Sequence, residues 1–579
     1  MTYFGLHLLT SRWFMLFASL LIMSVNGTSY LFGIYSNDLK TTLGYDQTTL
    51  NTVGFFKDLG SSLGIISGLI NEVCPPWVVL AIGASMNFCG YFMIWLAVTG
   101  RTDQPHLWLI CLYIFIGSDS QSFIHTGGLT TAVKNFPESR GVVLGLLKGY
   151  VGLSGAMMAQ IYHALHGNDT KALILLVAWL PAAVTFMFLP VIRLMKVTRQ
   201  GNELQVFYSL LYISLCLAAF LMAIIITQNR YLFNRIEYIA CAAVVLILAF
   251  SQLLVVGKED FSAWKKSMSL MPSRTNNSSY KKVEMPASET SMSTEAVAPT
   301  PAPKKRVGCL DNVFHPPGFG EDYTILQALF SVDMLIILLT TSCGIGGTLT
   351  AVDNLGQIGK ALGYPSNSIT TFVSLVSIWN YLGRVSIGFS SEFFLQKYKF
   401  PRPLMLTLIL LLACVGHLLI AFAVPNSLYL ASVIIGFCVG AQMTLLFTLI
   451  SEIFGLKYYS TLFQFGAVGG PVGTYALNVK VAGHLYDKEA RNQLAAKGLT
   501  RQAGEVLACN GRECYRRSFI IIAAASLFSC LLSLILVYRT REFYKGDIYK
   551  KFREEPNSAD TNTELAANPT ATNPLVELT

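Results

Sequence analysis

The sequence predicts an all-α protein that crosses a membrane many times. Hydrophobic residues make up 53% of the 579 residues and charged residues only 13%, whereas a soluble domain usually carries about 25% charge. The mean hydropathy is +0.51. Apolar stretches of about 20 residues, the length that crosses a bilayer, recur along most of the chain. A soluble globular domain is therefore excluded.

The positions of these apolar stretches predict about fourteen transmembrane helices, arranged as two six-helix bundles with two extra helices between them. The expected spans are 13–33, 48–70, 76–98, 107–132, 141–163, 171–193, 205–227, 237–256, 327–352, 368–390, 403–424, 427–450, 460–485 and 517–538.

The same pattern divides the chain into regions. The segment between the eighth and ninth spans is rich in Ser, Thr, Pro and Lys and cannot bury a core, so we expect a disordered linker that is a candidate kinase substrate. The expected regions are an N-terminal bundle (1–200), two additional helices (201–257), the linker (258–322), a C-terminal bundle (323–540) and a disordered tail (541–579).

Lys and Arg residues predict the orientation in the membrane. They concentrate on one side of the spans if both termini lie in the cytosol, as the positive-inside rule requires. The stretch "CNGREC" then lies in an outer loop, where we expect a disulfide between Cys509 and Cys514, with two free thiols as the alternative. Asn168, in the sequon Asn-Asp-Thr, is a candidate glycosylation site. We expect the protein to lie in the plasma membrane or in the vacuolar membrane.

Composition and motifs also indicate what the protein does not do. The net charge of +9 is spread between the spans instead of forming one basic patch, which argues against nucleic-acid binding. No nucleophile–base set and no metal-ligand spacing stands out. We therefore expect no enzymatic activity, no cofactor and no metal.

An internal repeat relates the two halves of the chain. The stretch "LGYDQTTLNTVGFFKDLGSSLGIISGLINE" (43–72) aligns with "LGYPSNSITTFVSLVSIWNYLGRVSIGFSSE" (362–392), and both copies end in Gly-x-x-x-Glu, at Gly68–Glu72 and Gly388–Glu392. An even number of spans separates the copies, so they share one orientation. Parallel halves related by an axis along the membrane normal are the architecture of major facilitator transporters.

Longer stretches carry a family resemblance. The set "RWFMLFASLLIMSVNGTSYLFGIYSNDLK", "FFKDLG", "NEVCPPWVVL", "RGVVLGLLKGYVGLSGA" and "CNGREC" is similar to plant nodulin-like major facilitator proteins, the group that includes the nuclear fusion defective type. The resemblance covers residues 12 to about 540. It implies a plant membrane carrier and, through a more distant likeness to oxalate/formate exchangers, a small carboxylate as solute.

The Gly-x-x-x-Glu repeats resemble the major facilitator loop motif, in which an acidic residue and basic partners latch the cytoplasmic face. The second copy, "NYLGRVSIGFSSEFFLQKYKFPRP", fits better, because the first lacks the basic residues. We expect Arg384 to pair with Glu392 or Glu452. The complete set of expected latch residues is Gly68, Glu72, Arg140, Arg384, Gly388, Glu392 and Glu452.

Charged residues inside the spans are functional candidates, because an ionisable group at bilayer depth costs several kcal/mol unless it is paired or hydrated. Lys57 and Asp58 of "FFKDLG", Asp119 and Lys148 fall at similar depths. They could form structural ion pairs, Lys57 with Asp119 and Asp58 with Lys148. Alternatively, one of the lysines attracts an anionic solute in a central cavity.

Proton coupling is a third role for these groups, because a buried carboxylate can carry a proton. The candidates are Asp58 and Asp119, with His125 as a weaker one. The second half adds two candidates for solute binding: Asn380, in the span that corresponds to that of Lys57, and Lys480 as another anion ligand. The complete set of expected solute-binding residues is Lys57, Asp58, Asp119, Lys148, Asn380 and Lys480. Snorkelling toward the outer surface is the simpler interpretation of Lys480.

These observations predict a secondary active transporter. Its halves would rock about a central site and move a small solute, expected to be an organic anion, with a proton or counter-substrate as the coupled species. The alternative function is a transport-inactive membrane receptor or scaffold that signals through the linker.

Overall fold

The computed structural model describes residues 8–45, 47–103, 105–167, 169–195, 202–228, 231, 233–270, 313–496 and 509–550. The regular secondary structure of these residues is entirely helical. Asn168, most of the predicted linker and most of the predicted tail lie outside the described residues.

The N-terminal half begins with two interrupted segments and continues with unbroken helices. Its elements are α2 (Arg12–Val25), η1 (Thr28–Leu31), α3 (Phe32–Leu43), α4 (Gln47–Ser62), α5 (Ile65–Val73), α6 (Pro76–Val98), α7 (Leu107–Asn135), α8 (Arg140–His166) and α9 (Thr170–Phe188). The first expected span, 13–33, is thus longer than predicted and breaks near Asn26. The second breaks at Leu63–Gly64, between α4 and α5.

The two additional helices are α10 (Glu203–Gln228) and α11 (Arg235–Leu270). They pack mainly on α8 and α2, and α10 also contacts α14 of the other half. Because α11 continues to Leu270, the predicted start of a disordered linker at residue 258 is wrong.

The C-terminal half repeats the plan of the first half. Its elements are α12 (Ile325–Leu329), α13 (Val332–Ala361), α14 (Ser366–Tyr398), α15 (Arg402–Phe422), α16 (Ser427–Ile453), α17 (Tyr459–Ala467), α18 (Gly469–Thr474), the π-helical η2 (Tyr475–Gly483), α19 (His484–Ala496) and α20 (Glu513–Lys545). Eleven helices among the described residues are long and apolar enough to cross a membrane. Three further segments, α2–α3, α14 and α17–η2, also cross the bundle, so the expected spans are present.

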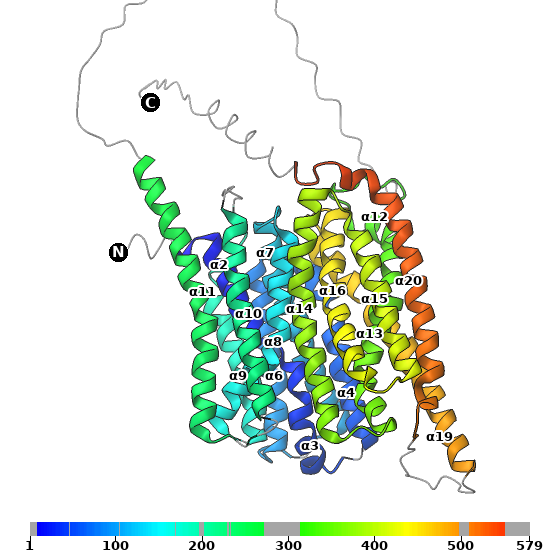
Figure 1. Cartoon of the computed structure of the whole chain (residues 1–579). Helices are drawn as coiled ribbons and strands as arrows, with labels where there is room; N and C mark the ends of the chain where they lie inside the picture. Colours follow the sequence, from blue (N-terminus) through cyan, green and yellow to red (C-terminus); the bar gives the residue numbers. More distant parts are fainter. Residues whose placement is uncertain are drawn as a thin grey trace, which may run out of the picture.

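The elements run between two opposite faces of the bundle (Figure 1). We call one the Arg402 face; α2, α13 and α15 begin there, and α11 and α20 end there. The opposite end carries the α3–α4 connection, α19 and the disulfide, and we call it the disulfide face. These two names refer only to residues and do not assign either face to a side of the membrane.

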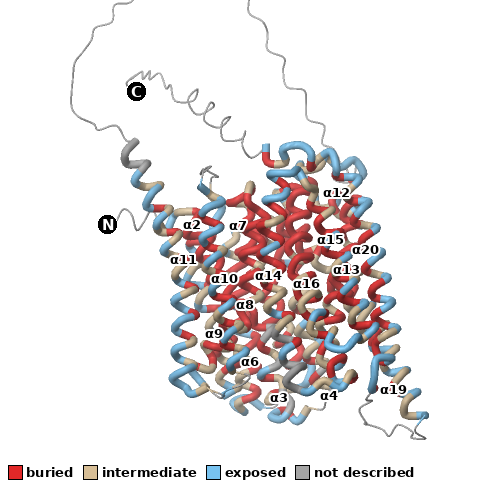
Figure 2. The backbone as a smooth tube through the Cα atoms, in the orientation of Figure 1, coloured by how far each residue is buried: buried red, intermediate tan, exposed pale blue. Residues whose placement is uncertain are grey.

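The apolar core shows how the halves fit together. One cluster of buried side chains spans both halves toward the Arg402 face. Toward the disulfide face the core divides into one cluster in the N-terminal half and another in the C-terminal half. Buried residues accordingly run through the middle and toward the Arg402 face (Figure 2). The halves are joined at the Arg402 face and separate at the other.

Candidate functional site

Two cationic side chains from different halves meet in the middle of the bundle. Lys148 lies on α8 and Arg384 on α14. The Arg384 Nη1 donates a hydrogen bond to the Lys148 carbonyl at 2.6 Å. The Lys148 ammonium lies 4.6 Å from the centre of the Phe447 ring on α16, a distance at which a cation–π attraction operates.

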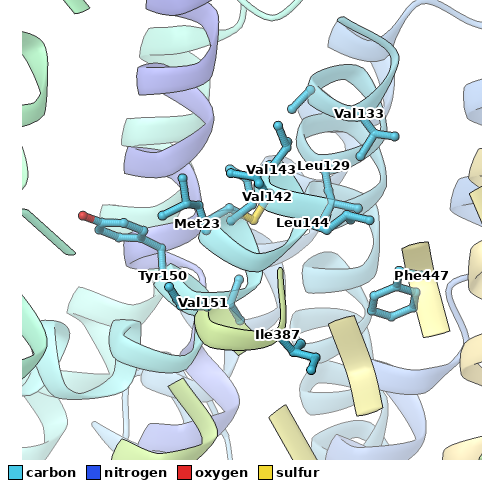
Figure 3. Close-up of a cluster of buried hydrophobic side chains, with 14 of the residues drawn as sticks. Met23, Leu129, Val133, Val142, Val143, Leu144, Tyr150, Val151, Ile387 and Phe447 are labelled. Atoms are coloured by element: carbon cyan, nitrogen blue, oxygen red, sulfur yellow. The ribbon is translucent and has the colours of Figure 1, made fainter. Parts of the chain in front are cut away.

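Glycines bring α8 and α14 close enough for this contact. A Cβ at Gly145 would lie 2.9 Å from the Arg384 carbonyl oxygen and 3.0 Å from the Gly388 Cα. Small residues allow two transmembrane helices to approach at backbone distance. The glycine positions on α8 therefore place Lys148 against α14, and Figure 3 shows the buried apolar side chains of α7 and α8 around this region, with Ile387 and Phe447.

The central charge has no counter-charge in the described part of the chain, where neither Lys148 nor Arg384 forms a salt bridge with a carboxylate. His125 on α7 interacts electrostatically with both cations, and its Nε2 is buried without a hydrogen-bond partner. The Arg384 Nε and the Asn380 Oδ1 are also buried and unpartnered. We call Lys148, Arg384, His125, Asn380 and Phe447 the central polar site.

Buried polar atoms normally have hydrogen-bond partners, so a cluster of exceptions needs an explanation. The unpartnered atoms of the central polar site are the His125 Nε2, the Asn380 Oδ1 and the cationic Arg384 Nε, and both halves contribute. An anion that accepts hydrogen bonds would satisfy the Arg384 Nε and add the missing negative charge. The chemistry of the site is therefore that of an anion receptor between two halves.

Lys57 and Asp58 lie elsewhere and pair with each other. The Lys57 Nζ is 2.9 Å from the Asp58 Oδ1, and the Asp58 side chain is 71% exposed. The Lys57 ammonium lies 5.1 Å from the centre of the Phe32 ring. The expected pairs of Lys57 with Asp119 and of Asp58 with Lys148 are therefore wrong for this conformation. Asp353 of the other half interacts electrostatically with Lys57 and Asp58, which places all three at the opening between the halves.

Lys480 also lies toward the disulfide face. It is exposed on η2 and sits 5.6 Å from the centre of the Tyr475 ring. It lines a cavity of about 630 Å³, whose walls include Asn354 and Asn478. The Asn354 Nδ2 donates to the Asn478 Oδ1 at 2.7 Å.

A buried charge network closes the Arg402 face. The Arg402 Nη2 is 2.5 Å from the Glu392 Oε2, and its Nε is 2.8 Å from the Glu452 Oε1. A further hydrogen bond runs from the Arg402 Nη1 to the Ser391 hydroxyl. The guanidinium is fully buried, so it neutralises two carboxylates away from solvent.

The end of the chain completes this network. The Tyr544 hydroxyl donates to Glu452 at 2.8 Å, and the Tyr549 hydroxyl donates to Glu392 at 2.9 Å. Burial and the neighbouring Glu392 raise the pKa of Tyr549 well above its ordinary value, so its hydroxyl stays protonated. Residues 541–550 thus belong to the packed structure, and the predicted start of a disordered tail at residue 541 is wrong.

The N-terminal half reaches the same network. The Arg140 guanidinium donates to the Ser451 carbonyl at 2.6 Å and lies 5.5 Å from the centre of the Tyr549 ring. A Cβ at Gly141 would lie 2.7 Å from the Arg402 Nη1. Closure of this face therefore depends on direct contact between α8 of one half and the Arg402 network of the other.

A second contact between the halves joins α5 and α17. Glu72 accepts a hydrogen bond from the Thr461 backbone amide at 3.2 Å and lies 3.8 Å from the Lys134 ammonium. A Cβ at Gly68 would lie 2.7 Å from the Ser460 carbonyl oxygen. Gly68 and Glu72 of the first Gly-x-x-x-Glu motif therefore both contact α17 at this interface.

The prediction that Arg384 pairs with Glu392 or Glu452 is wrong, and the residue that does so, Arg402, was not predicted. Glu392 and Glu452 pair with Arg402. Arg384 lies about two turns before Glu392 on α14, roughly 12 Å away along the helix axis. The signal for Arg402 was present in "KFPRP" directly after the second motif. Nothing in the sequence indicated Tyr549.

The Tyr549 hydroxyl offers a test of this arrangement. Tyr549→Phe keeps the ring but removes a donor from a buried carboxylate, so we expect the free energy of unfolding to fall by about 1–3 kcal/mol. Thermal unfolding in nanodiscs measures the change. Tyr538→Phe is the matched control, because Tyr538 is 80% exposed on α20. Equal stability of the two variants would contradict the assigned contact.

Cys509 and Cys514 form the expected disulfide, which links the segment before α20 to the first turn of that helix. The adjacent Gly511 amide donates to the Ala361 carbonyl at 2.7 Å, which ties this segment to the end of α13. The sequon asparagine, Asn168, lies outside the described residues.

Comparison with protein families matches both halves of the chain. The Nodulin-like family model matches residues 12–257, and the model of the NFD4 C-terminal domain matches residues 326–546. The protein NUCLEAR FUSION DEFECTIVE 4 of Arabidopsis thaliana is 23% identical over 549 residues, which cover 92% of this chain and 89% of that protein. The probable transporter MCH1 of Yarrowia lipolytica is 25% identical over 222 residues, 37% of this chain and 43% of that protein.

Solved structures show the same architecture. The proton:xylose symporter XylE, a major facilitator superfamily protein, superimposes with a TM-score of 0.51 at 12% identity, covering 90% of this chain and 96% of XylE. At this identity the likeness concerns the fold alone. The membrane-spanning bundle described above is thus a major facilitator fold.

Proposed function

Because this chain belongs to the nodulin-like group of the major facilitator superfamily, we propose that it is a secondary active transporter of a small organic anion. The observation that carries the proposal is the central polar site, where Lys148 and Arg384 of opposite halves meet without a carboxylate partner. Unpaired buried charge is costly in a membrane. An anionic solute that reaches the site would remove that cost.

Binding between the halves suits alternating access. Major facilitator halves rock about a fixed site near the middle of the membrane. Lys148 comes from one half and Arg384 from the other, so an anion bound between them can draw the halves together. A solute that binds one conformation more tightly shifts the population toward it.

The described conformation supports one half of such a cycle. The halves meet at the Arg402 face and separate at the disulfide face, so the central polar site is approached from the disulfide face. A disulfide favours an oxidising compartment, and Lys and Arg favour the cytosolic side. We therefore assign the Arg402 face and both termini to the cytosol, and the disulfide face to the outside or to the vacuolar lumen.

The driving force would come from a proton or a counter-substrate, with Asp58, Asp119 and His125 as coupling candidates. The alternative of a transport-inactive scaffold that signals through the linker is less well supported, because the full-length fold and the partial likeness to MCH1 both point to transport.

Ligand-induced stabilisation tests the proposal without a transport assay. The unfolding temperature of the protein in nanodiscs would be measured with mono- and dicarboxylates, neutral sugars and amino acids. At a concentration about 100 times the Kd, a ligand adds about 2.7 kcal/mol of stability. We expect this from at least one carboxylate for the wild type.

Three variants make the result specific. Lys148→Met and Arg384→Met keep an unbranched side chain but remove the charge, and both are expected to lose the carboxylate effect. Lys480→Met, at the disulfide face, is the control and should keep it. Stabilisation of Lys148→Met and the wild type by the same carboxylate to the same extent would overturn the assigned site.

A further inference from the structure

A ladder of hydrogen bonds runs along one stripe of α7, where it packs on α4 and α5. Its rungs are Ser122 Oγ to the Ser61 carbonyl at 3.1 Å, Thr126 Oγ1 with Ser67 Oγ at 2.7 Å, and Asn71 Nδ2 to Thr130 Oγ1 at 3.2 Å. The α7 residues of the ladder are three or four positions apart, so they share one face of the helix.

Asp119 occupies the next position on this stripe, one turn before Ser122. Its side chain is 93% buried, since its exposed fraction is 7%, and its Oδ1 has no hydrogen-bond partner. The α4 residue opposite is Gly60, where a Cβ would lie 2.5 Å from the Phe115 carbonyl oxygen and 3.2 Å from the Asp119 amide nitrogen. The stripe therefore continues to a buried acidic residue whose backbone packs against a glycine of α4.

The surrounding charges do not neutralise this carboxyl group. Within the described part of the chain no salt bridge reaches Asp119, and Lys57 and Asp58 on α4 are paired with each other. The other titratable groups on α7 and on the helices packed against it are Cys111, Tyr113, His125 and Lys134 on α7, Arg12 on α2, Glu72 on α5, Cys89 and Tyr91 on α6, Arg140, Lys148, Tyr150, Tyr162, His163 and His166 on α8, and Tyr459 on α17. Arg12, Glu72 and Arg140 lie at the Arg402 face.

We propose that Asp119 is the proton-binding residue of the transport cycle and that it is protonated in the described conformation. A protonated carboxyl group fits between α4 and α7 without a counter-charge, whereas a carboxylate there is costly. A metal cation would need several oxygen ligands. The close packing at Gly60 leaves no room for them, and the neighbouring Ser61 carbonyl already accepts a hydrogen bond.

The ladder is connected to the contact between the halves. The Gln464 Nε2 on α17 donates to the Thr126 Oγ1 at 2.8 Å and to the Ser122 carbonyl at 3.3 Å. Gln464 belongs to the C-terminal half, so the packing of α4, α5 and α7 supports closure of the Arg402 face directly. Loss of the proton from Asp119 would weaken the packing of α4 and α5 on α7 and favour opening of the Arg402 face. The proton would then leave to the water at that face.

This inference rests on the proposed transport function but is tested separately from solute binding. Spin labels at Leu194 and Lys397, exposed positions of the two halves at the Arg402 face, report the separation of the halves in nanodiscs. Cys89 and Cys216, which are exposed free cysteines, and Cys309, which lies outside the described residues, would first be replaced by Ser so that they do not react with the label. Distances are measured by double electron–electron resonance from pH 5 to pH 9, without solute.

The wild type is expected to show short distances at low pH, with the short-distance population falling roughly threefold or more as the pH rises. Asp119→Asn, which mimics the protonated state, should keep the short distance at every pH. Asp119→Glu should still titrate, which separates a proton site from a packing defect. Asp103→Asn, which changes an exposed acid between α6 and α7, is the matched control and should behave as the wild type does.

Several results would overturn the inference. They are a wild type without pH response, an Asp119→Asn variant that titrates normally, and a wild type that responds to Na⁺ at constant pH instead of to protons. None of these affects the carboxylate stabilisation described above. Failure of that experiment, with normal pH behaviour here, would overturn the organic-anion assignment and leave the proton site standing.

Discussion

Arg402→Ala is expected to lower the free energy of unfolding by roughly 3–5 kcal/mol and to open the Arg402 face, because it leaves two buried carboxylates without their shared cation. Among the described residues, Arg402 is the one cationic side chain that forms salt bridges with both Glu392 and Glu452. Its loss would also remove the surface on which Gly141 packs. Thermal unfolding in nanodiscs and the Leu194–Lys397 label distance measure the two effects.

Two comparisons make this result interpretable. Arg402→Lys keeps one charge but cannot contact both acids with a planar fork, so it should fall between the wild type and Arg402→Ala. Lys397→Ala removes an exposed cation near the end of α14 and should change the unfolding temperature little. An Arg402→Ala protein as stable and as closed as the wild type would show that the network is not what holds this face together.

Gly145→Ala is expected to reduce transport by about tenfold or more, because closure of the Arg402 face needs α8 and α14 at backbone distance. The added Cβ would lie 2.9 Å from a carbonyl oxygen of α14. Since this neighbour is backbone, one helix must move. The same label distance should lengthen in the variant even at low pH.

Gly152→Ala is the matched control for this substitution. Gly152 lies on the same helix, but a Cβ there has no neighbour closer than 3.8 Å. It should leave both the label distance and the transport rate close to the wild-type values. Equal behaviour of the two variants would mean that the α8–α14 contact does not limit closure.

The sequence predicted the spans and the all-helical fold well, because bilayer thickness and backbone hydrogen bonding constrain both strongly. It did not predict the breaks at Asn26 and Leu63–Gly64, since hydropathy averages over a whole span. The ends of α11 and α20 were also missed. A helix that leaves the membrane loses the apolar signal that marked it, although its hydrogen bonding continues.

The candidate site was predicted in part, and the reason lies in tertiary contacts. Depth alone grouped Lys148 with Lys57 and Asp58, yet the structure places Lys148 beside Arg384 of the other half. The position of Arg384 near the cytosolic end of its span likewise suggested that it pairs with the acidic latch residues. Which half supplies a partner depends on how α8 meets α14, and a single sequence does not contain that information.

Uptake of labelled carboxylates into proteoliposomes, with and without an inward proton gradient, tests the central claim most directly. Wild type, Lys148→Met, Arg384→Met and Lys480→Met would be compared at equal reconstitution. The account predicts uptake of at least one carboxylate by the wild type and by Lys480→Met, and its loss in the two central variants. Uptake that survives in both central variants would contradict an anion site between Lys148 and Arg384.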